Sequence, residues 1–242
     1  MKFGITVSQI NEVDLVVQAE NAGYDFCWVW DSPMIRSNLW ALLALVAERT
    51  SRISIGPGVA IPALSMAPVT ANAIATINAI APGRTFLGVG TGNTALRAMG
   101  QVPMTIQALE AQLKVIRGLL AGETVAYEAN GINEDIAFQS LELGCINLDD
   151  PIPIHISGFG PKAQALAGEY GDGLITGIPR GGTIPNALAN VKVGADRAGR
   201  ALAKFETYAL VNLMLLRPGE TLQSARVFDE VGSSIMVNIH PV

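Results

Sequence analysis

Short apolar segments alternate with segments of helical periodicity along most of this 242-residue chain. The apolar segments lack the regular polar alternation of a half-exposed strand, which indicates strands buried on both faces of a parallel sheet. The pattern predicts seven strands, at residues 2–7, 27–31, 52–62 and 85–93, from 152 to Ser157, in the segment ending at Gly177, and at 206–216. It predicts helices at residues 10–26, 38–50, 68–80 and 104–122, after Gly160, and at 183–203.

Residues 123–151 interrupt this rhythm, and their segments VAYEANG and IAFQSLEL predict a small β insertion. Repeated alternation of strand and helix fits either an open doubly wound sheet or a (β/α)8 barrel. A single domain over residues 1–242 is close to the ~250 residues of a typical barrel, and the strand ends resemble a barrel rim. We therefore expect an α/β fold of the TIM-barrel type.

Composition narrows the range of partners. Half of the residues are hydrophobic and 15% are charged, which predicts a large core. The net charge of -5 argues against nucleic-acid binding. No apolar run approaches the ~20 residues that span a bilayer, and MKFGITVSQ resembles a strand more than a signal peptide, so we expect a cytoplasmic protein without membrane partners. Cys27 and Cys145 lie far apart and without metal-type spacing, so no metal site is expected.

Ligands bind at the carboxyl ends of the strands in either architecture. Those ends carry glycines, small hydroxyl side chains and few titratable groups: Ser8, Gln9, Asp31, Ser32, 58–61, 90–93, 157–160 and 177–180. They hold no HExxH motif, nucleophile elbow or carboxylate pair on neighbouring ends. This composition predicts a site built for a cofactor that supplies its own reactivity.

The sequence SGFGP after the fifth predicted strand is the most informative motif. Gly158 and Gly160 would allow backbone N–H groups to approach an anion, and the helix that follows would aim its unpaired N-terminal amides at the same point. The motif therefore indicates a phosphorylated ligand. The alternative is that both glycines only form a tight turn between strand and helix.

Three single residues have two interpretations each. His155 lies on the same strand face as Ser157, and is either a hydrogen-bonded core histidine or a catalytic residue below the rim. Asp31 either anchors a ring or substrate, or caps the turn that follows it. Arg180 either pairs with an anionic ligand or is an ordinary surface residue.

The segments RISIGPGVAIP, APVTANAIATINAIAPGRTFLGVGTGN and SGFGPKAQALAGEYGDGLITG resemble the luciferase-like flavin-dependent oxidoreductases. This superfamily includes bacterial luciferase, alkanesulfonate monooxygenase and enzymes that use the deazaflavin coenzyme F420. The similarity extends from about residue 1 to about residue 216, and APGRTFLGVGTG is its most specific part. The resemblance implies a (β/α)8 barrel with an insertion, and hydride or oxygen chemistry at a flavin bound to the strand ends.

The resemblance also implies roles for individual residues. SGFGP matches the phosphate-binding turn of the family, and GPGV matches its bulged third strand, where a cis peptide bond between Gly58 and Val59 would lie against the flavin. GTGN places Asn93 at the pyrimidine edge of the flavin or at the substrate. The cofactor contacts implied are Gly58, Val59, Gly90, Thr91, Ser157, Gly158, Phe159, Gly160, Gly177 and Ile178.

The chain departs from the family at two places. The F420-dependent sugar-phosphate branch carries a histidine and an acid where this chain has Ser32 and Asn93, so sugar-phosphate dehydrogenation is not expected. Asn93, Asp31 and His155 remain the candidate catalytic residues, and Ser32 and Arg180 the candidate substrate contacts. The C-terminus is short for the family, and we expect either residues 235–240 or a partner subunit to take the place of the eighth strand.

Our first functional hypothesis is a two-component monooxygenase that uses reduced FMN, delivered by a flavin reductase, to oxidise a small organic substrate. One alternative is an F420-dependent reductase or dehydrogenase, and another is a non-catalytic flavin-binding protein. A homodimer is expected from the resemblance.

Overall fold

A computed structural model of the chain describes residues 1–177 and 183–231. It contains two compact units, Met1–Tyr208 and Ala209–Val242. The first unit holds nearly all of the regular structure, and a helical segment at residues 225–231 is the regular structure of the second. The expectation of one domain over the whole chain stays a prediction. The expected eighth strand at 235–240 lies outside the described residues.

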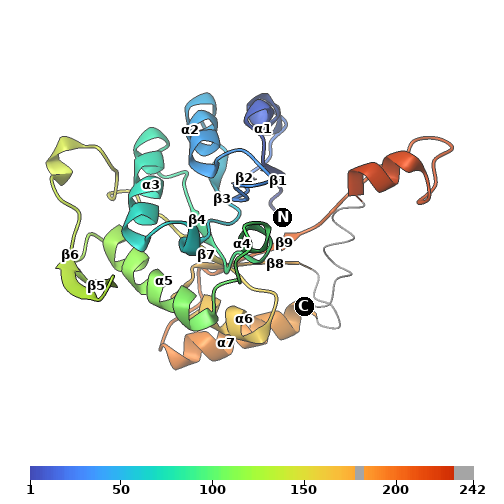
Figure 1. Cartoon of the computed structure of the whole chain (residues 1–242). Helices are drawn as coiled ribbons and strands as arrows, with labels where there is room; N and C mark the ends of the chain where they lie inside the picture. The colour runs from blue at the N-terminus through green and yellow to red at the C-terminus, as the bar shows by residue number, and fades with distance from the viewer. Residues whose placement is uncertain (178–182, 232–242) are drawn as a thin grey trace. The chain divides into compact units, whose positions relative to one another are not determined.

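Parallel strands form the centre of the first unit (Figure 1). Parallel ladders join β1 to β2, β2 to β3, β4 to β7 and β7 to β8, and β9 follows β8 in the sheet. Single parallel bridges, Ile55 to Thr85 and Ala60 to Val89, connect the β3 segment to the β4 segment. The strands are β1 (Gly4–Val7), β2 (Phe26–Val29), β3 (Ser54–Pro57), β4 (Leu87–Val89), β7 (Ile154–Ser157), β8 (Gly173–Gly177) and β9 (Glu206–Leu210).

The order of these strands decides between the two architectures. Their spatial order follows their order in the chain, with only the inserted hairpin left out. A doubly wound sheet would reverse its order at a switch point, whereas a barrel does not. The fold is therefore the predicted α/β barrel type, and all seven predicted strands are present. The last one ends at Leu210 and not at residue 216, because residues 211–216 have no ladder partner in the described part of the chain.

Helices α1, α2, α3, α5, α6 and α7 lie around the strands (Figure 1). The prediction at 10–26 is too long, because Gly23 takes a φ of 87° just after the helix and turns the chain into β2. A short helix after β4 and the 3-10 turn at Pro62–Leu64 were not predicted, whereas the 3-10 turn at Ile10–Glu12 lies inside the predicted helix 10–26. The helical elements are η1 (Ile10–Glu12), α1 (Val13–Asn21), α2 (Leu39–Arg49), η2 (Pro62–Leu64), α3 (Ala67–Ile80), α4 (Asn93–Ala98), α5 (Ile106–Leu120), α6 (Pro161–Tyr170) and α7 (Ile184–Arg197).

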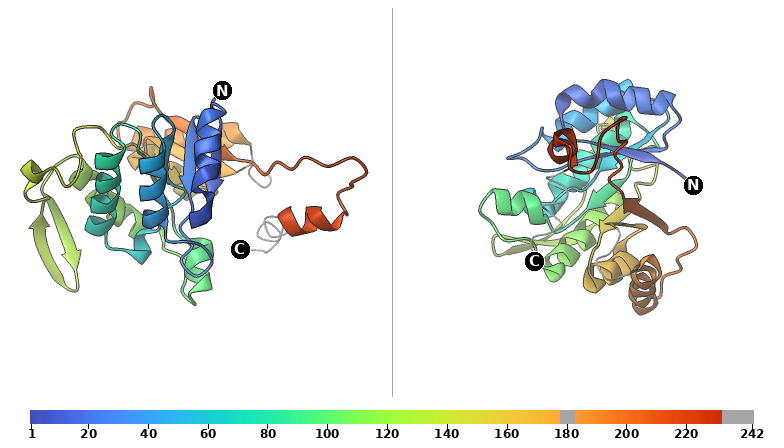
Figure 2. Two further views of the ribbon diagram at one scale, coloured as in Figure 1. Left: turned by 90° about the horizontal axis from the view of Figure 1, so that it is seen from above. Right: turned by 90° about the vertical axis from the view of Figure 1, so that its right-hand side faces the viewer.

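The predicted β insertion is confirmed as an antiparallel hairpin of β5 (Val125–Ala129) and β6 (Ile132–Ile136), followed by the 3-10 turn η3 (Leu141–Leu143). The hairpin stands apart from the parallel strands (Figure 2). Within the described residues, no helix is both long and apolar enough to cross a membrane. The same residues contain no group of three or more His, Cys, Asp or Glu side chains arranged for a metal ion.

Aromatic rings on one strand face pack against glycines on neighbouring strands. A Cβ atom added to Gly4 would lie 2.2 Å from the Trp28 ring, and one added to Gly56 would lie 2.5 Å from the Phe86 ring. His155 and Tyr208 complete this cluster, with ring centroids 4.8 Å apart. The glycines therefore make room for rings that fill the space below the strand ends.

Candidate functional site

The carboxyl ends of β3, β4 and β7 meet at one point. A Cβ atom added to Gly90 would lie 2.7 Å from Val59 Cγ2 and 3.3 Å from Ser157 Cβ. A Cβ atom added to Gly58 would lie 2.5 Å from Trp28 Cβ, so the Trp28 side chain packs directly below the same segment. The structure thus brings four of the predicted cofactor contacts together, and they form a surface without charged side chains.

The peptide bond between Gly58 and Val59 is cis, as predicted. The segment around this bond changes partners along its length. The Gly58 N–H donates to Val29 O at 2.7 Å on the β2 side, whereas the Ala60 N–H donates to Gly88 O at 2.8 Å on the β4 side. The segment after β3 therefore joins the end of β2 to the end of β4.

Asp31 lies just after β2 and is half-buried. Its Oδ2 accepts a hydrogen bond from the Ile61 N–H at 3.2 Å, so the carboxyl connects the β2 end to the β3 end. Burial raises the pKa of Asp31 to about 6, and the hydrogen bond from Ile61 opposes the shift. The next residue, Ser32, begins a turn in which its carbonyl accepts from the Ile35 N–H at 2.9 Å. Asp31 is thus a carboxyl that can change protonation state near neutral pH.

The two glycines of SGFGP differ in their surroundings. A Cβ atom added to Gly158 would lie 3.0 Å from the backbone of Ala163, whereas one added to Gly160 would have no neighbour within 4 Å. Gly160 is the N-cap of α6 and has a φ of -114°, which suits any residue. The tight-turn interpretation therefore explains Gly158, and it leaves Gly160 unexplained. Phe159 is 64% exposed, and its ring lies over Gly177.

His155 is buried and packs by stacking. Its ring centroid lies 4.9 Å from that of Phe86 and 4.8 Å from that of Tyr208. Burial lowers the pKa of His155 to about 4, so the imidazole is neutral at physiological pH. Its Nδ1 atom has no hydrogen-bond partner among the described residues. Burial in the core is confirmed, and the expected hydrogen bond is not made by Nδ1.

Asn93 is exposed and begins α4. Its Oδ1 accepts from Arg97 Nε at 2.8 Å, which is a bond within the helix. The sequence pattern placed Asn93 at the rim, at the end of the predicted strand 85–93, and did not predict this helix. Thr91 precedes it, and the Thr91 carbonyl accepts from the Met104 N–H at 3.0 Å. Ile178 and Arg180, which were predicted to bind cofactor and substrate, lie outside the described residues.

Sequence reasoning missed a buried amide next to the SGFGP turn. Gln164 on α6 is 4% exposed, and its Nε2 donates to Gly158 O at 3.5 Å. The signal was present in PKAQALAG, where a polar residue between two alanines occupies a helix position that faces the core.

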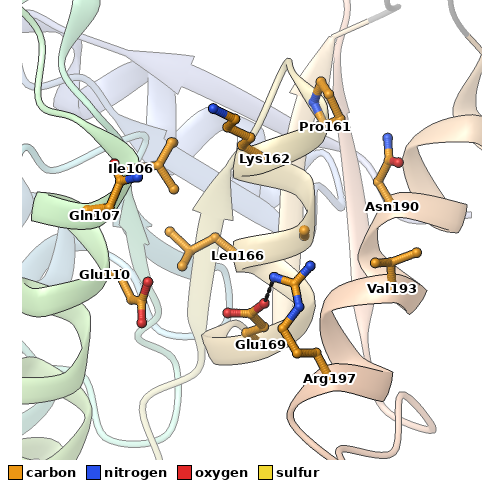
Figure 3. Close-up of a pocket in the computed structure, with 11 residues that line it drawn as sticks. Ile106, Gln107, Glu110, Pro161, Lys162, Leu166, Glu169, Asn190, Val193 and Arg197 are labelled. Atoms are coloured by element: carbon orange, nitrogen blue, oxygen red, sulfur yellow. Dashed lines mark hydrogen bonds and ion pairs between the residues drawn. The ribbon is translucent and has the colours of Figure 1, made fainter.

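A groove of about 370 Å³ lies on the outside of the barrel, between α5, α6 and α7 (Figure 3). An ion pair between Glu169 and Arg197 closes one end of it. Lys162, in the first turn of α6, lies near the other end. None of the strand-end residues described above lines this groove. It is therefore separate from the candidate site.

Comparison with known proteins gives a consistent set of relatives. The model of a family described as luciferase-like monooxygenase matches residues 7–226. The chain is 30% identical to a 5,10-methylenetetrahydromethanopterin reductase of Archaeoglobus fulgidus, over 93% of this chain and 68% of that protein. It is 31% identical to an F420-dependent glucose-6-phosphate dehydrogenase of Nakamurella multipartita, over 80% of this chain and 60% of that protein.

Solved structures show the same fold. An F420-dependent secondary alcohol dehydrogenase in complex with an F420-acetone adduct superposes with a TM-score of 0.75 at 26% identity, over 87% of this chain and 68% of that one. The oxygenating constituent of a type II Baeyer-Villiger monooxygenase of Pseudomonas putida, in complex with FMN, has a TM-score of 0.67 at 17% identity, over 86% of this chain and 66% of that one. At this identity, the similarity to the second structure shows only that the two chains share a fold.

Proposed function

Because this chain belongs to the luciferase-like monooxygenase family, we propose that it is an oxidoreductase that uses coenzyme F420 to oxidise or reduce a small organic substrate. The support for F420 is that a relative at 31% identity and a solved structure at 26% identity are both F420-dependent by name. FMN has support from solved structures that share the fold alone, at 16% and 17% identity. The hypothesis of a reduced-FMN monooxygenase is thus the less supported one, and the F420 alternative replaces it.

The chain spans 60% of the length of the glucose-6-phosphate dehydrogenase relative and 68% of the reductase relative. The activity, substrate and partners of the whole protein are therefore part of this proposal. Homodimer formation stays a prediction. A flavin reductase would be needed only under the FMN hypothesis.

The strand ends fit a planar, phosphorylated cofactor. Val59, Gly90 and Ser157 form an uncharged surface on which a ring can lie. Gly160 adds open space at the start of a ten-residue helix, where unpaired N–H groups favour an anion. These residues would hold the ring and the phosphate, respectively.

A bound deazaflavin supplies hydride transfer, and the protein supplies position and a proton. Asp31 is our candidate for the proton, because a carboxyl with a pKa of about 6 can both release and accept one near neutral pH. The Ile61 N–H holds Oδ2 and fixes the orientation of the carboxyl. The Trp28 side chain packs against Gly58 at the same strand ends.

One observation carries the proposal best. A half-buried carboxyl with a raised pKa ends β2, and the glycine turn ends β7, so a titratable group and an anion site flank the uncharged surface between them. Carboxyls with perturbed pKa values cluster at functional sites, and here the carboxyl lies at the same strand ends as the open space beside Gly160.

The test is a fluorescence titration of the purified chain with F420 and, separately, with FMN. We expect F420 to bind at least tenfold more tightly, a difference of about 1.4 kcal/mol. Oxygen consumption is then measured with each reduced cofactor. Tighter binding of FMN together with oxygen consumption would restore the monooxygenase hypothesis, and binding of either cofactor without turnover of any alcohol, aldehyde or ketone would favour a binding protein.

A further inference from the structure

Gln164 is an unusual residue for the inner face of a helix, because its amide is almost completely buried. Both ends of that amide have partners. Its Oε1 accepts from Asn190 Nδ2 of α7 at 2.8 Å, and its Nε2 donates to the Gly158 carbonyl at 3.5 Å. The second separation is long for an N–H···O bond, so this contact is the weaker of the two. The three residues form a chain of hydrogen bonds from α7 through α6 to the SGFGP turn.

Close packing of α6 against α7 brings together the residues that form these hydrogen bonds. A Cβ atom added to Gly168 would lie 1.9 Å from Val191 O, and one added to Gly194 would lie 1.8 Å from Ala165 O. The backbones therefore approach each other as closely as glycine allows. Gln164 lies four residues before Gly168, and Asn190 lies four residues before Gly194, so each amide is one helical turn from the contact. That register brings the two amides together.

The chain of hydrogen bonds fixes one peptide plane in the turn. The Gly158 N–H donates to Ile175 O of β8 at 2.9 Å, and its carbonyl faces Gln164. In a planar trans peptide the N–H points opposite to the C=O. The N–H of Phe159 therefore points away from Gln164 and from α6. Among the described residues it has no hydrogen-bond acceptor.

We propose that Gln164, held by Asn190, is a positioning residue that orients the Gly158–Phe159 peptide so that the Phe159 N–H faces an anionic group of the ligand. This inference rests on the proposed function, because it assumes that the turn receives the cofactor phosphate. The role is indirect, since Gln164 lies behind the turn and touches the ligand only through the backbone.

The test compares ligands with and without a phosphate in Gln164→Met, which keeps the length of the side chain and removes its donor. FMN and riboflavin serve as one pair, and F420 and its phosphate-free deazaflavin chromophore as the other. We expect the affinity for the phosphorylated member of each pair to fall about fivefold, which is the usual effect of one neutral hydrogen bond, and the affinity for the other member to stay within twofold. An equal loss for both members, or no loss for either, overturns the proposal.

Gln107→Met is the matched control, because Gln107 is exposed on α5. It should change neither affinity. Asn190→Ala should act in the same direction as Gln164→Met but more weakly, and the double variant should lose no more than Gln164→Met alone. Asn190→Ala also keeps the test valid if Gln164→Met does not fold.

Gly160→Asp separates this inference from the proposed function. It places a carboxylate in the open space at the turn without a steric clash. Unchanged F420 binding in Gly160→Asp would show that the turn does not receive the phosphate, and the proposed site would be wrong. A loss in Gly160→Asp without a loss in Gln164→Met would overturn the positioning role alone.

Discussion

On the two sides of the candidate site, the hydrogen bonds between side chain and backbone run in opposite directions. On the β2 and β3 side, a side-chain acceptor, the Asp31 carboxyl, binds a backbone donor, the Ile61 N–H. On the β7 and α6 side, a side-chain donor, the Gln164 amide, binds a backbone acceptor, the Gly158 carbonyl. The first arrangement leaves a titratable carboxyl at the site, and the second leaves backbone N–H groups. The comparison teaches that proton transfer and anion binding can be assigned to different sides of one barrel rim.

The titratable groups on the two sides also differ. Burial raises the pKa of Asp31 to about 6 and lowers the pKa of His155 to about 4, because a buried site disfavours the charged form of either group. At neutral pH, Asp31 can exchange a proton and His155 stays neutral. Under the proposed function, acid-base chemistry would therefore belong to the β2 side and not to the β7 side.

The largest expected effect comes from removing the titratable carboxyl on the β2 and β3 side. In Asp31→Asn the side chain can still accept from Ile61, but it cannot transfer a proton, so turnover with F420 should fall by about 10²- to 10⁴-fold. Steady-state kinetics from pH 5 to 9 would show this loss and the disappearance of a pH dependence near 6.

The stability of Asp31→Asn gives an independent check. A carboxyl whose pKa is raised on folding stabilises the protein below its unfolded value of 3.8, and that contribution is lost as pH rises through about 6. Asp31→Asn should therefore be at least as stable as the parent at pH 8. A lower melting temperature at pH 8 combined with normal turnover would show that Asp31 has a structural role only.

The second prediction tests whether His155, on β7, is uncharged in the folded protein at neutral pH. The unfolded pKa of His155 is 6.5 and the folded pKa is about 4, so the unfolded chain binds more protons between these values. Its contribution to the free energy of unfolding, on the order of 3 kcal/mol, should be complete above pH 6.5 and lost as pH falls through 4. Chemical denaturation at several pH values would measure it.

His155→Phe supplies the control for this prediction, because a phenyl ring can replace the stacked imidazole and does not titrate. Its stability should change less between pH 6.5 and 4 than that of the parent. Parallel pH curves for the two proteins would show that His155 is not the group responsible.

Much of the fold around the site could be predicted from the sequence, because the signals lie within short segments. The seven strands were predicted because each is a short apolar run, and the position of the cis bond came from the resemblance carried by GPGV. The helix that begins at Asn93 was missed because it is only six residues long and follows Gly92, whose φ is 76°. The strand at 206–216 was predicted too long because composition cannot show whether a neighbouring strand is present.

The polar contacts of the site were not predictable in the same way. Asp31 and Ile61 are 30 residues apart, and Gln164 and Asn190 are 26 residues apart. Each pair meets only because strands or helices pack in one register, which a single sequence does not specify. The different surroundings of Gly158 and Gly160 likewise depend on where α6 lies relative to the turn.

The third prediction separates the two glycines on the β7 side. Gly158→Val should cost about 1–3 kcal/mol in the free energy of unfolding, because its Cβ would lie 3.0 Å from the α6 backbone. Gly160→Val should keep the stability of the parent and lower F420 affinity at least tenfold, or by about 1.4 kcal/mol. Thermal melts and F420 titrations measure both quantities. If Gly160→Val loses stability as Gly158→Val does and keeps the F420 affinity of the parent, the turn serves folding alone.

The smallest expected effect is at Asn93, which begins α4 and belongs to neither side. Asn93→Ala removes the bond from Arg97 Nε to Asn93 Oδ1, an exposed contact four residues apart that contributes about 0.2–0.5 kcal/mol in helices. The melting temperature should therefore change by no more than a few degrees. We expect turnover with reduced cofactor to fall, because an amide at this position can donate to and accept from the flavin or the substrate. Arg97→Ala removes the same bond from the other end and keeps the amide, so it should leave turnover unchanged. If both variants lower turnover equally, the hydrogen bond that orders the start of α4 is what matters, and Asn93 does not contact the ligand.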